Sequence, residues 1–84
     1  MFYVQGFYKI KRIANFNQYK DLLKKYLLSK FVKGTIILSP EGINGTIAGK
    51  KKDVKNCIEY IKDKFSIVSF DSYNTSICEF LPFY

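Results

Sequence analysis

Three consecutive lysines, Lys50, Lys51 and Lys52, form the most suggestive cluster of charged side chains in this 84-residue sequence. They directly precede an amphipathic pattern that predicts a helix, so their positive charges would oppose the helix macrodipole. A phosphate held between these side chains and the free N–H groups of the first helical turn would relieve that conflict. The alternative interpretation is an ordinary run of solvated lysines with no binding role.

The middle of the chain holds four of the five glycines and predicts a β-hairpin. Two β-branched runs, Thr35–Leu38 and Ile43–Ala48, flank Ser39-Pro40-Glu41-Gly42. Proline presets φ at the second turn position, and we expect the following glycine to adopt the left-handed conformation that closes the turn. Asn44-Gly45 is a rival turn signal, but a turn there would place the proline inside a strand and interrupt the ladder.

Glu41, Gly42, Asn44 and Gly45 are the polar and glycine residues of this hairpin motif. A carboxylate and an amide in and beside a tight turn could orient a ligand. Turn chemistry is the preferred interpretation, because an asparagine side chain in such a position commonly bonds its own backbone.

Neither cysteine has the neighbours of a nucleophile or a metal ligand. The sequence contains no histidine, and Cys57 and Cys78 stand far apart without a CxxC spacing. Activation of a thiol needs a nearby base, and the spacing indicates neither a zinc site nor a disulfide framework. We therefore expect two reduced thiols, with Cys57 in the core, and no metal, cofactor or catalytic residue in this chain.

The composition, 48% hydrophobic and 18% aromatic, predicts one small packed domain. Fourteen basic against seven acidic residues give a net charge of +7, which favours a polyanionic partner such as nucleic acid. Nearly all the basic residues are lysine, so we expect contacts to phosphate rather than to base edges. The sequence shows no basic leader and no stretch of about 20 apolar residues, so we expect a cytoplasmic protein without a membrane partner.

Hydrophobic periodicity predicts two strands and two helices around the hairpin. The first strand, Phe2–Ile10, is expected to be buried on both faces, with Gly6 as a bulge or a point of close approach. The first helix follows a cap of Asn15 and Gln18, and Ile67–Phe70 is the last strand. The first helix has apolar positions at Phe16, Tyr19, Leu22, Leu23, Tyr26 and Leu27 opposite Lys20, Lys24 and Lys25, and the second at Val54, Cys57, Ile58 and Ile61.

The order β-α-β-β-α-β over this length predicts an α+β fold of the ferredoxin-like, split βαβ type, an antiparallel sheet with both helices on one face. In this topology the loop 10–14 lies beside the hairpin tip 40–42, and the exit of the first helix, 29–33, lies beside the entry to the second, 49–52. The predicted nucleic-acid-binding residues at that second end are Lys30, Lys33, Lys50, Lys51 and Lys52.

Aromatic residues of the first strand, Tyr3, Phe7 and Tyr8, could stack on bases from an open sheet face. Packing is the preferred interpretation, since the aromatic-basic pattern of RNA-binding sheets is missing. The segment 71–76 is polar and turn-rich, whereas 77–84 is apolar and has no cap or turn. We therefore expect a domain at 1–76, with 77–84 beginning a segment that leads to another domain.

Val4-Gln5-Gly6-Phe7-Tyr8 resembles the Val-Gln-Gly opening of the acylphosphatase phosphate loop, and the hairpin resembles that family's hairpin at Gly34 and Pro40-Glu41-Gly42. The catalytic residues do not match. Tyr8 and Lys9-Ile10 replace the loop glycine and the arginine, and Leu38 stands at the position of the catalytic asparagine. The resemblance therefore implies an acylphosphatase-like fold and not acyl-phosphate hydrolysis.

The block Lys33–Gly49, with Glu41-Gly42-Ile43-Asn44-Gly45 at its centre, resembles the signature of the N-terminal domain of the rhodanese-related tRNA uridine hydroxylases. The ending Pro82-Phe83-Tyr84 resembles the Pro-Phe-His that leads into their rhodanese domain. The resemblance implies a full-length enzyme that uses molecular oxygen to convert the wobble uridine of certain tRNAs to 5-hydroxyuridine. That family's catalytic cysteine belongs to the rhodanese domain, so Cys78 inherits no role.

We therefore expect a domain that is non-catalytic alone and docks tRNA, through the phosphate backbone, for a tRNA-modifying enzyme whose rhodanese domain is its second partner. One alternative is a purely structural module that packs on the rhodanese domain and never touches RNA. The least favoured is a small acyl-phosphate hydrolase.

Overall fold

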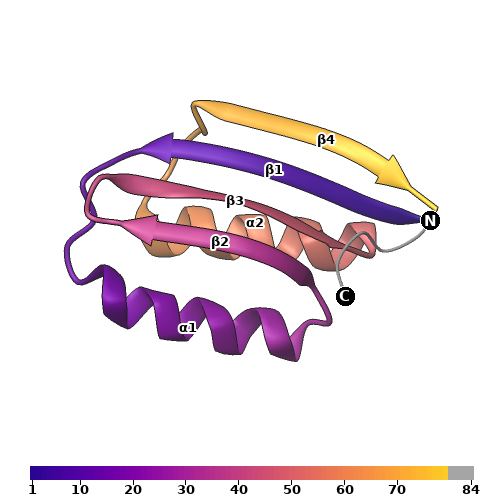
Figure 1. Ribbon diagram of the computed structural model, residues 1–84, viewed down its shortest axis with the longest axis horizontal. Coiled ribbons are helices and arrows are strands. Elements are labelled where there is room, and N and C mark those ends of the chain that lie inside the picture. The colour runs from indigo at the N-terminus through magenta and orange to yellow at the C-terminus, as the bar shows by residue number, and fades with distance from the viewer. Residues whose placement is uncertain (80–84) are drawn as a thin grey trace.

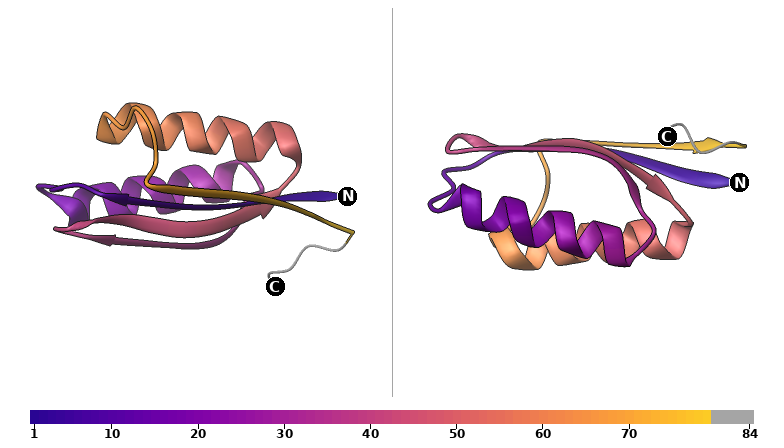
Figure 2. Two further views of the ribbon diagram at one scale, coloured as in Figure 1. Left: turned by 90° about the horizontal axis from the view of Figure 1, so that it is seen from above. Right: turned by 60° about the horizontal axis from the view of Figure 1, so that its bottom comes forward.

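The computed structural model describes residues 1–79. Four strands form one antiparallel sheet in the order β2-β3-β1-β4, and both helices lie on one face of it (Figure 1, Figure 2). The predicted βαββαβ order and the ferredoxin-like, acylphosphatase-like fold class are confirmed. The elements are β1 (Phe2–Ile10), α1 (Phe16–Ser29), β2 (Lys33–Ser39), β3 (Gly42–Gly49), α2 (Lys51–Phe65) and β4 (Ser72–Cys78).

β2 and β3 form the predicted hairpin, with Ser39 opposite Gly42, and the rival Asn44-Gly45 lies inside β3. Gly42 is needed for a reason other than the predicted one. Its φ is +159°, well away from the left-handed value of about +57°. A Cβ here would overlap the backbone carbonyl oxygen of Lys9, so the close approach of two chain segments selects glycine.

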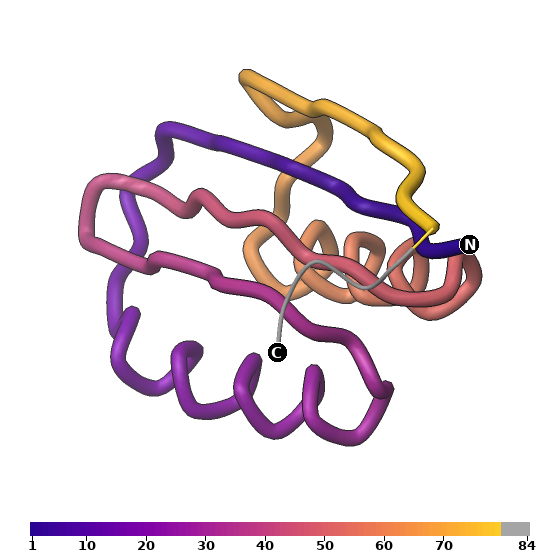
Figure 3. The backbone as a smooth tube through the Cα atoms, turned by 45° about the vertical axis from the view of Figure 1, so that its right-hand side comes forward, coloured from indigo at the N-terminus to yellow at the C-terminus, as the bar shows by residue number. Residues whose placement is uncertain are grey.

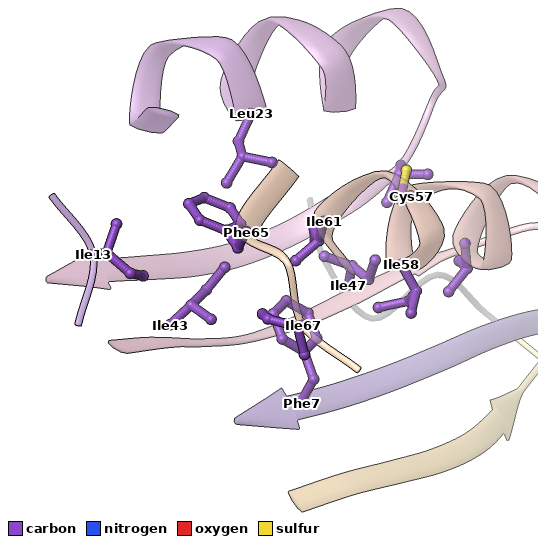
Figure 4. Close-up of a cluster of buried hydrophobic side chains, with 12 residues drawn as sticks. Phe7, Ile13, Leu23, Ile43, Ile47, Cys57, Ile58, Ile61, Phe65 and Ile67 are labelled. Carbon is purple, nitrogen blue, oxygen red and sulfur yellow. The ribbon is translucent and has the colours of Figure 1, made fainter. Parts of the chain in front are cut away.

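The hydrophobic core lies between the sheet and the helices (Figure 4). Ile43 and Ile47 of β3 and Ile61 of α2 are at most 1% exposed, and Cys57 is buried beside them as predicted. The apolar stripe predicted for α2 is therefore confirmed. Because a chain of this size buries a modest share of its surface, these few aliphatic side chains carry much of its stability.

α1 packs less deeply than α2. Leu23 is its buried residue, whereas Leu22, predicted on the apolar stripe, is 47% exposed. The predicted cap is also wrong: Asn15 has a left-handed φ of 56° and its side chain makes no cap bond. Its backbone carbonyl instead accepts the N–H of Gln18 at 3.0 Å. The left-handed conformation of Asn15 turns the chain sharply into the helix. In this geometry its side chain points away from the unpaired N–H groups of the first helical turn, which it was expected to cap.

β1 is one of the two central strands, yet only one of its faces is buried. Phe7 and Gln5 are buried on the helix side, whereas Tyr8 and Ile10, which point the opposite way, are exposed. The prediction of burial on both faces was wrong, because an antiparallel sheet with helices on one side leaves its other side uncovered. Gly6 pairs regularly with both neighbouring strands and forms no bulge.

Gln5 is a fully buried polar side chain that attaches β4 to β1. Its Nε2 donates to the carbonyl oxygen of Asn74 at 2.9 Å, and its Oε1 accepts the hydroxyl of Thr75 at 2.8 Å. A buried amide without partners would cost roughly 1–3 kcal/mol, so these bonds favour one register of β4 over the alternatives. The sequence analysis gave this residue no role.

The last strand was predicted at Ile67–Phe70, and this prediction was wrong. Ile67 is buried, and Phe70 packs on Phe7 with ring centroids 5.4 Å apart, so these two residues are apolar because they pack on the core from a connection. Val68 between them is exposed. The strand is β4, which pairs with β1 from Ser72 to Cys78. Its polar sequence suits an edge strand with both faces in water. β4 continues past the predicted boundary at residue 76, and the rest of the predicted 77–84 segment lies outside the described residues from position 80.

Among residues 1–79, no helix is long and apolar enough to cross a membrane.

Candidate nucleic-acid interface

The connections gather at two ends of the domain, as predicted. At one end, which we call the hairpin end, Lys11 N–H donates to the carbonyl of Glu41 and Ile13 N–H to that of Pro40, both at 3.0 Å. At the other, the exit of α1 lies beside the entry to α2 (Figure 3), and Lys33 is paired with Ala48. We call this second end, defined by Lys30, Lys33, Lys50, Lys51 and Lys52, the lysine end.

All five lysines of the lysine end are exposed. Lys50 immediately precedes α2, and its carbonyl accepts the N–H of Val54 at 2.9 Å. No side chain caps this helix, so donors of its first turn are open to an anion. Asp53 in the same turn is acidic and compensates part of the unfavourable lysine charge. The sequence analysis overlooked this carboxylate.

Lys30 is turned toward the helix layer. Its Nζ lies 5.6 Å from the centre of the Tyr26 ring, which is stacked on Tyr60 with centroids 3.9 Å apart. This cation–π contact is weak at an exposed position and leaves the ammonium accessible. Residue spacing alone could not predict the contact between Lys30 and Tyr26, because the position of the Tyr26 ring depends on the packing of α1 against α2.

Three of the four hairpin-motif residues, Glu41, Gly42 and Gly45, are placed by contacts within the fold. Glu41 donates its N–H to Ser39 Oγ at 3.2 Å, and its carbonyl holds the loop after β1. Asn44 lies within β3, so the turn chemistry expected for it was wrong. A Cβ on Gly45 would lie 2.6 Å from the carbonyl oxygen of Thr35, so glycine is required by the pairing of β2 with β3.

The thiol of Cys57 is unsuited to nucleophilic chemistry. Burial, together with the nearby Asp53 carboxylate, raises its pKa to about 11, although Lys30 acts in the opposite direction. A thiol with such a pKa is neutral at physiological pH and therefore inert.

Ionic contacts neutralise little of the positive charge. Within residues 1–79 the one ion pair joins Lys9 Nζ to Asp71 Oδ1 at 3.4 Å, at the hairpin end. The backbone N–H of Ile10 also donates to this carboxylate at 2.7 Å and holds its pKa below the usual range, with further help from Lys9. The lysines of the lysine end form no ion pair in the part of the chain that the structure describes, so they present a positive field that Asp53 reduces only in part.

The sequence analysis did not anticipate a shallow hollow on the sheet face opposite the helices. It has a volume of about 530 Å³, and Gly6, Thr46 and Asn74 lie at its centre. Alternation of small polar residues at Ser72, Asn74 and Ser76 was the available signal. It was interpreted as a turn-rich segment.

Comparison with known proteins identifies relatives of this chain. Residues 2–84 match the family model of the UPF0176 acylphosphatase-like domain. The chain is 45% identical over 84 residues to the tRNA uridine(34) hydroxylase of Pelagibacter ubique (strain HTCC1062). That alignment covers all of this chain and 28% of the hydroxylase, so the chain spans little more than a quarter of this relative's length.

Proposed function

Because the chain belongs to the family of UPF0176 acylphosphatase-like domains, we propose that it is the N-terminal domain of a tRNA-modifying enzyme and that it binds the phosphate backbone of tRNA. The proposed whole enzyme uses molecular oxygen to convert the wobble uridine to 5-hydroxyuridine. Its catalytic cysteine lies in a rhodanese domain outside this chain. The name of the 45% identical relative supports the choice of tRNA and of hydroxylation.

The lysine end is the observation that carries the docking role. Lys33 begins β2 opposite Ala48, two residues before Lys50 in the chain, so two connections bring positive side chains to the same edge. The uncapped N-terminus of α2 adds backbone donors to that edge. Lysine contacts phosphate as a point charge and reads no base sequence. Binding is therefore expected to be tolerant of tRNA sequence and sensitive to salt.

The chain's own residues support binding better than chemistry. The sequence has no histidine, and Cys57 is a buried, neutral thiol. Leu38, at the position of the acylphosphatase asparagine, is partly buried and packs against the core. It has no amide with which to orient an attacking water. These features favour tRNA docking over acyl-phosphate hydrolysis.

The test compares two triple variants for tRNA affinity at several salt concentrations. One changes Lys50, Lys51 and Lys52 to alanine, and the control changes Lys20, Lys24 and Lys25 on α1, which removes the same charge. Each lost phosphate contact should lower the slope of log affinity against log salt by about 0.7–0.9. We expect the first triple to flatten the slope by about 2.1–2.7 and the control to change it little.

Equal weakening by both triples would show that only net charge matters and that the lysine end is no site. No weakening by either would favour the competing function, a structural module that packs on the rhodanese domain without touching RNA.

A further inference from the structure

The sheet face that points away from the helices, which we call the open face, is almost free of charge. Figure 2 shows that α1 and α2 cover the opposite side only. Alternation along the strands places Ser, Thr, Asn, Gly, Tyr and aliphatic residues on the open face. Among the residues of the four described strands, Lys33, at one corner of the sheet, is the one charged residue on the open face. In a chain of net charge +7, such a surface is a poor match for RNA phosphates.

Part of the open face is apolar and exposed. Tyr8, Ile10 and Ile37 are 40%, 65% and 57% exposed. Tyr8 and Ile37 are both paired with Asn44, from opposite sides, and all three apolar residues line one hollow of about 270 Å³. Glu41, at the hairpin tip, is the one charged residue that lines this hollow. Neighbouring exposed aliphatic and aromatic side chains with a polar rim are typical of a protein-binding patch.

Gly6 is a glycine that the fold does not require. A Cβ added there would find no atom closer than 3.8 Å, in contrast to Gly42 and Gly45, where it would overlap backbone. Glycine inside a strand weakens the strand and often marks a place where another chain approaches closely. At Gly6 the missing side chain leaves the backbone uncovered in the larger, shallow hollow of the open face, so a side chain that protrudes from a partner has room to lie against β1.

We propose that the open face docks against the remainder of the same, longer polypeptide, through an uncharged and partly apolar protein surface that inserts a side chain over Gly6. This inference takes from the proposed function only that the chain is a domain of a larger protein. The matched part is 28% of the P. ubique relative, so most of such a polypeptide is left to provide the surface.

The geometry permits docking within one molecule. Cys78, the last residue of β4, pairs with Phe2 at the end of the sheet. The domain measures 37 × 24 × 19 Å. An extended chain covers about 3.3 Å per residue, so about a dozen residues reach any part of the open face. Lys33 lies at a corner of the open face. Lys30, Lys50, Lys51 and Lys52 belong to the helix ends, so these four lysines remain free for phosphate while the open face is covered.

The test is hydroxyl-radical footprinting of the full-length protein, which labels exposed side chains. Ile37 of the open face is matched by Leu28 of α1, which is 70% exposed, and Tyr8 is matched by Tyr73 on the helix side of β4, which is 49% exposed. We expect Ile37 and Tyr8 to be labelled at least fivefold more slowly than their matched residues. Equal labelling rates would overturn the proposal.

Two variants of the full-length protein complete the test. Ile37→Lys places a charge on the open face and should raise the labelling of Tyr8 to that of Tyr73, whereas Leu28→Lys should leave Tyr8 protected. Slow labelling of buried Phe65 confirms that each variant is folded. Protection that requires added tRNA would make RNA the occupant, and protection that rises with protein concentration would make it a second copy. Either result would overturn docking within one polypeptide, and neither depends on the salt slope that tests the lysine end.

Discussion

The hairpin end and the lysine end differ in what their residues are for. At the hairpin end, backbone groups of residues 10–13 are bonded to Asp71, Glu41 and Pro40, and Gly42 is fixed by the close approach of Lys9. At the lysine end, five exposed side chains project from the end of α1, the start of β2 and the start of α2. The fold itself thus requires Gly42 and Gly45 of the recognisable motif, whereas the candidate binding residues are an ordinary lysine run and two separate lysines. The glycines of a recognisable motif can therefore be explained by close packing of the backbone rather than by a role in binding or catalysis.

The largest effect that tests this contrast is Gly42→Ala. The added Cβ overlaps the carbonyl of Lys9 at a buried position, so the variant should lose at least about 2 kcal/mol of unfolding free energy. Urea denaturation measures the loss. Gly6→Ala is the matched control, because its Cβ has room, and it should be neutral or slightly stabilising. Similar losses in both variants would remove the structural explanation of the hairpin end.

The pH dependence of stability provides a second test, at Asp71. The hydrogen bond from Ile10 and the ion pair with Lys9 lower the pKa of this carboxyl from its ordinary value of 3.8. A lowered folded-state pKa contributes stability that is present above pH 3.8 and is lost as pH falls through the folded pKa. Asp71→Asn should therefore flatten the acid side of the stability profile, measured as melting temperature against pH. An unchanged acid limb would show that this carboxylate does not hold the hairpin end.

The smallest effects are expected at the lysine end. Lys51→Ala should change the unfolding free energy by less than about 0.5 kcal/mol. Replacement of Lys50, Lys51 and Lys52 together should leave the melting temperature unchanged or slightly raised, because positive charge next to a helix N-terminus is unfavourable. A marked drop in melting temperature, measured by circular dichroism, would mean that these lysines have a structural role that the exposed side chains do not reveal.

The sequence predicted the fold because its strongest signals are local. The turn residues Pro40-Glu41-Gly42 identified the hairpin, and apolar residues spaced three and four apart identified both helices. β4 was missed because its pairing with β1, rather than its own polar composition, makes it a strand. Asn15 was misassigned as a side-chain cap because its left-handed backbone cannot be recognised from residue type.

The candidate site was predictable only in part. The lysine run was evident in the sequence, and the topology correctly indicated which connections share an end. The contact of Lys30 with Tyr26 and the hollow at Gly6 depend on how helices and strands pack. Such features arise from contacts between distant parts of the chain, which periodicity does not encode.

The buried amide of Gln5 has a consequence for how the domain forms during synthesis. Its partners Asn74 and Thr75 lie 69 and 70 residues later in the chain. The ribosome therefore makes β1, which carries Gln5, first. It makes β4, which carries the two partners, last. Pairings this far apart in sequence form late and slowly. A nascent chain that stops short of β4 has the hairpin and two helices but lacks the two partners that β4 gives to Gln5, so the sheet is completed only after nearly all of the domain has been translated.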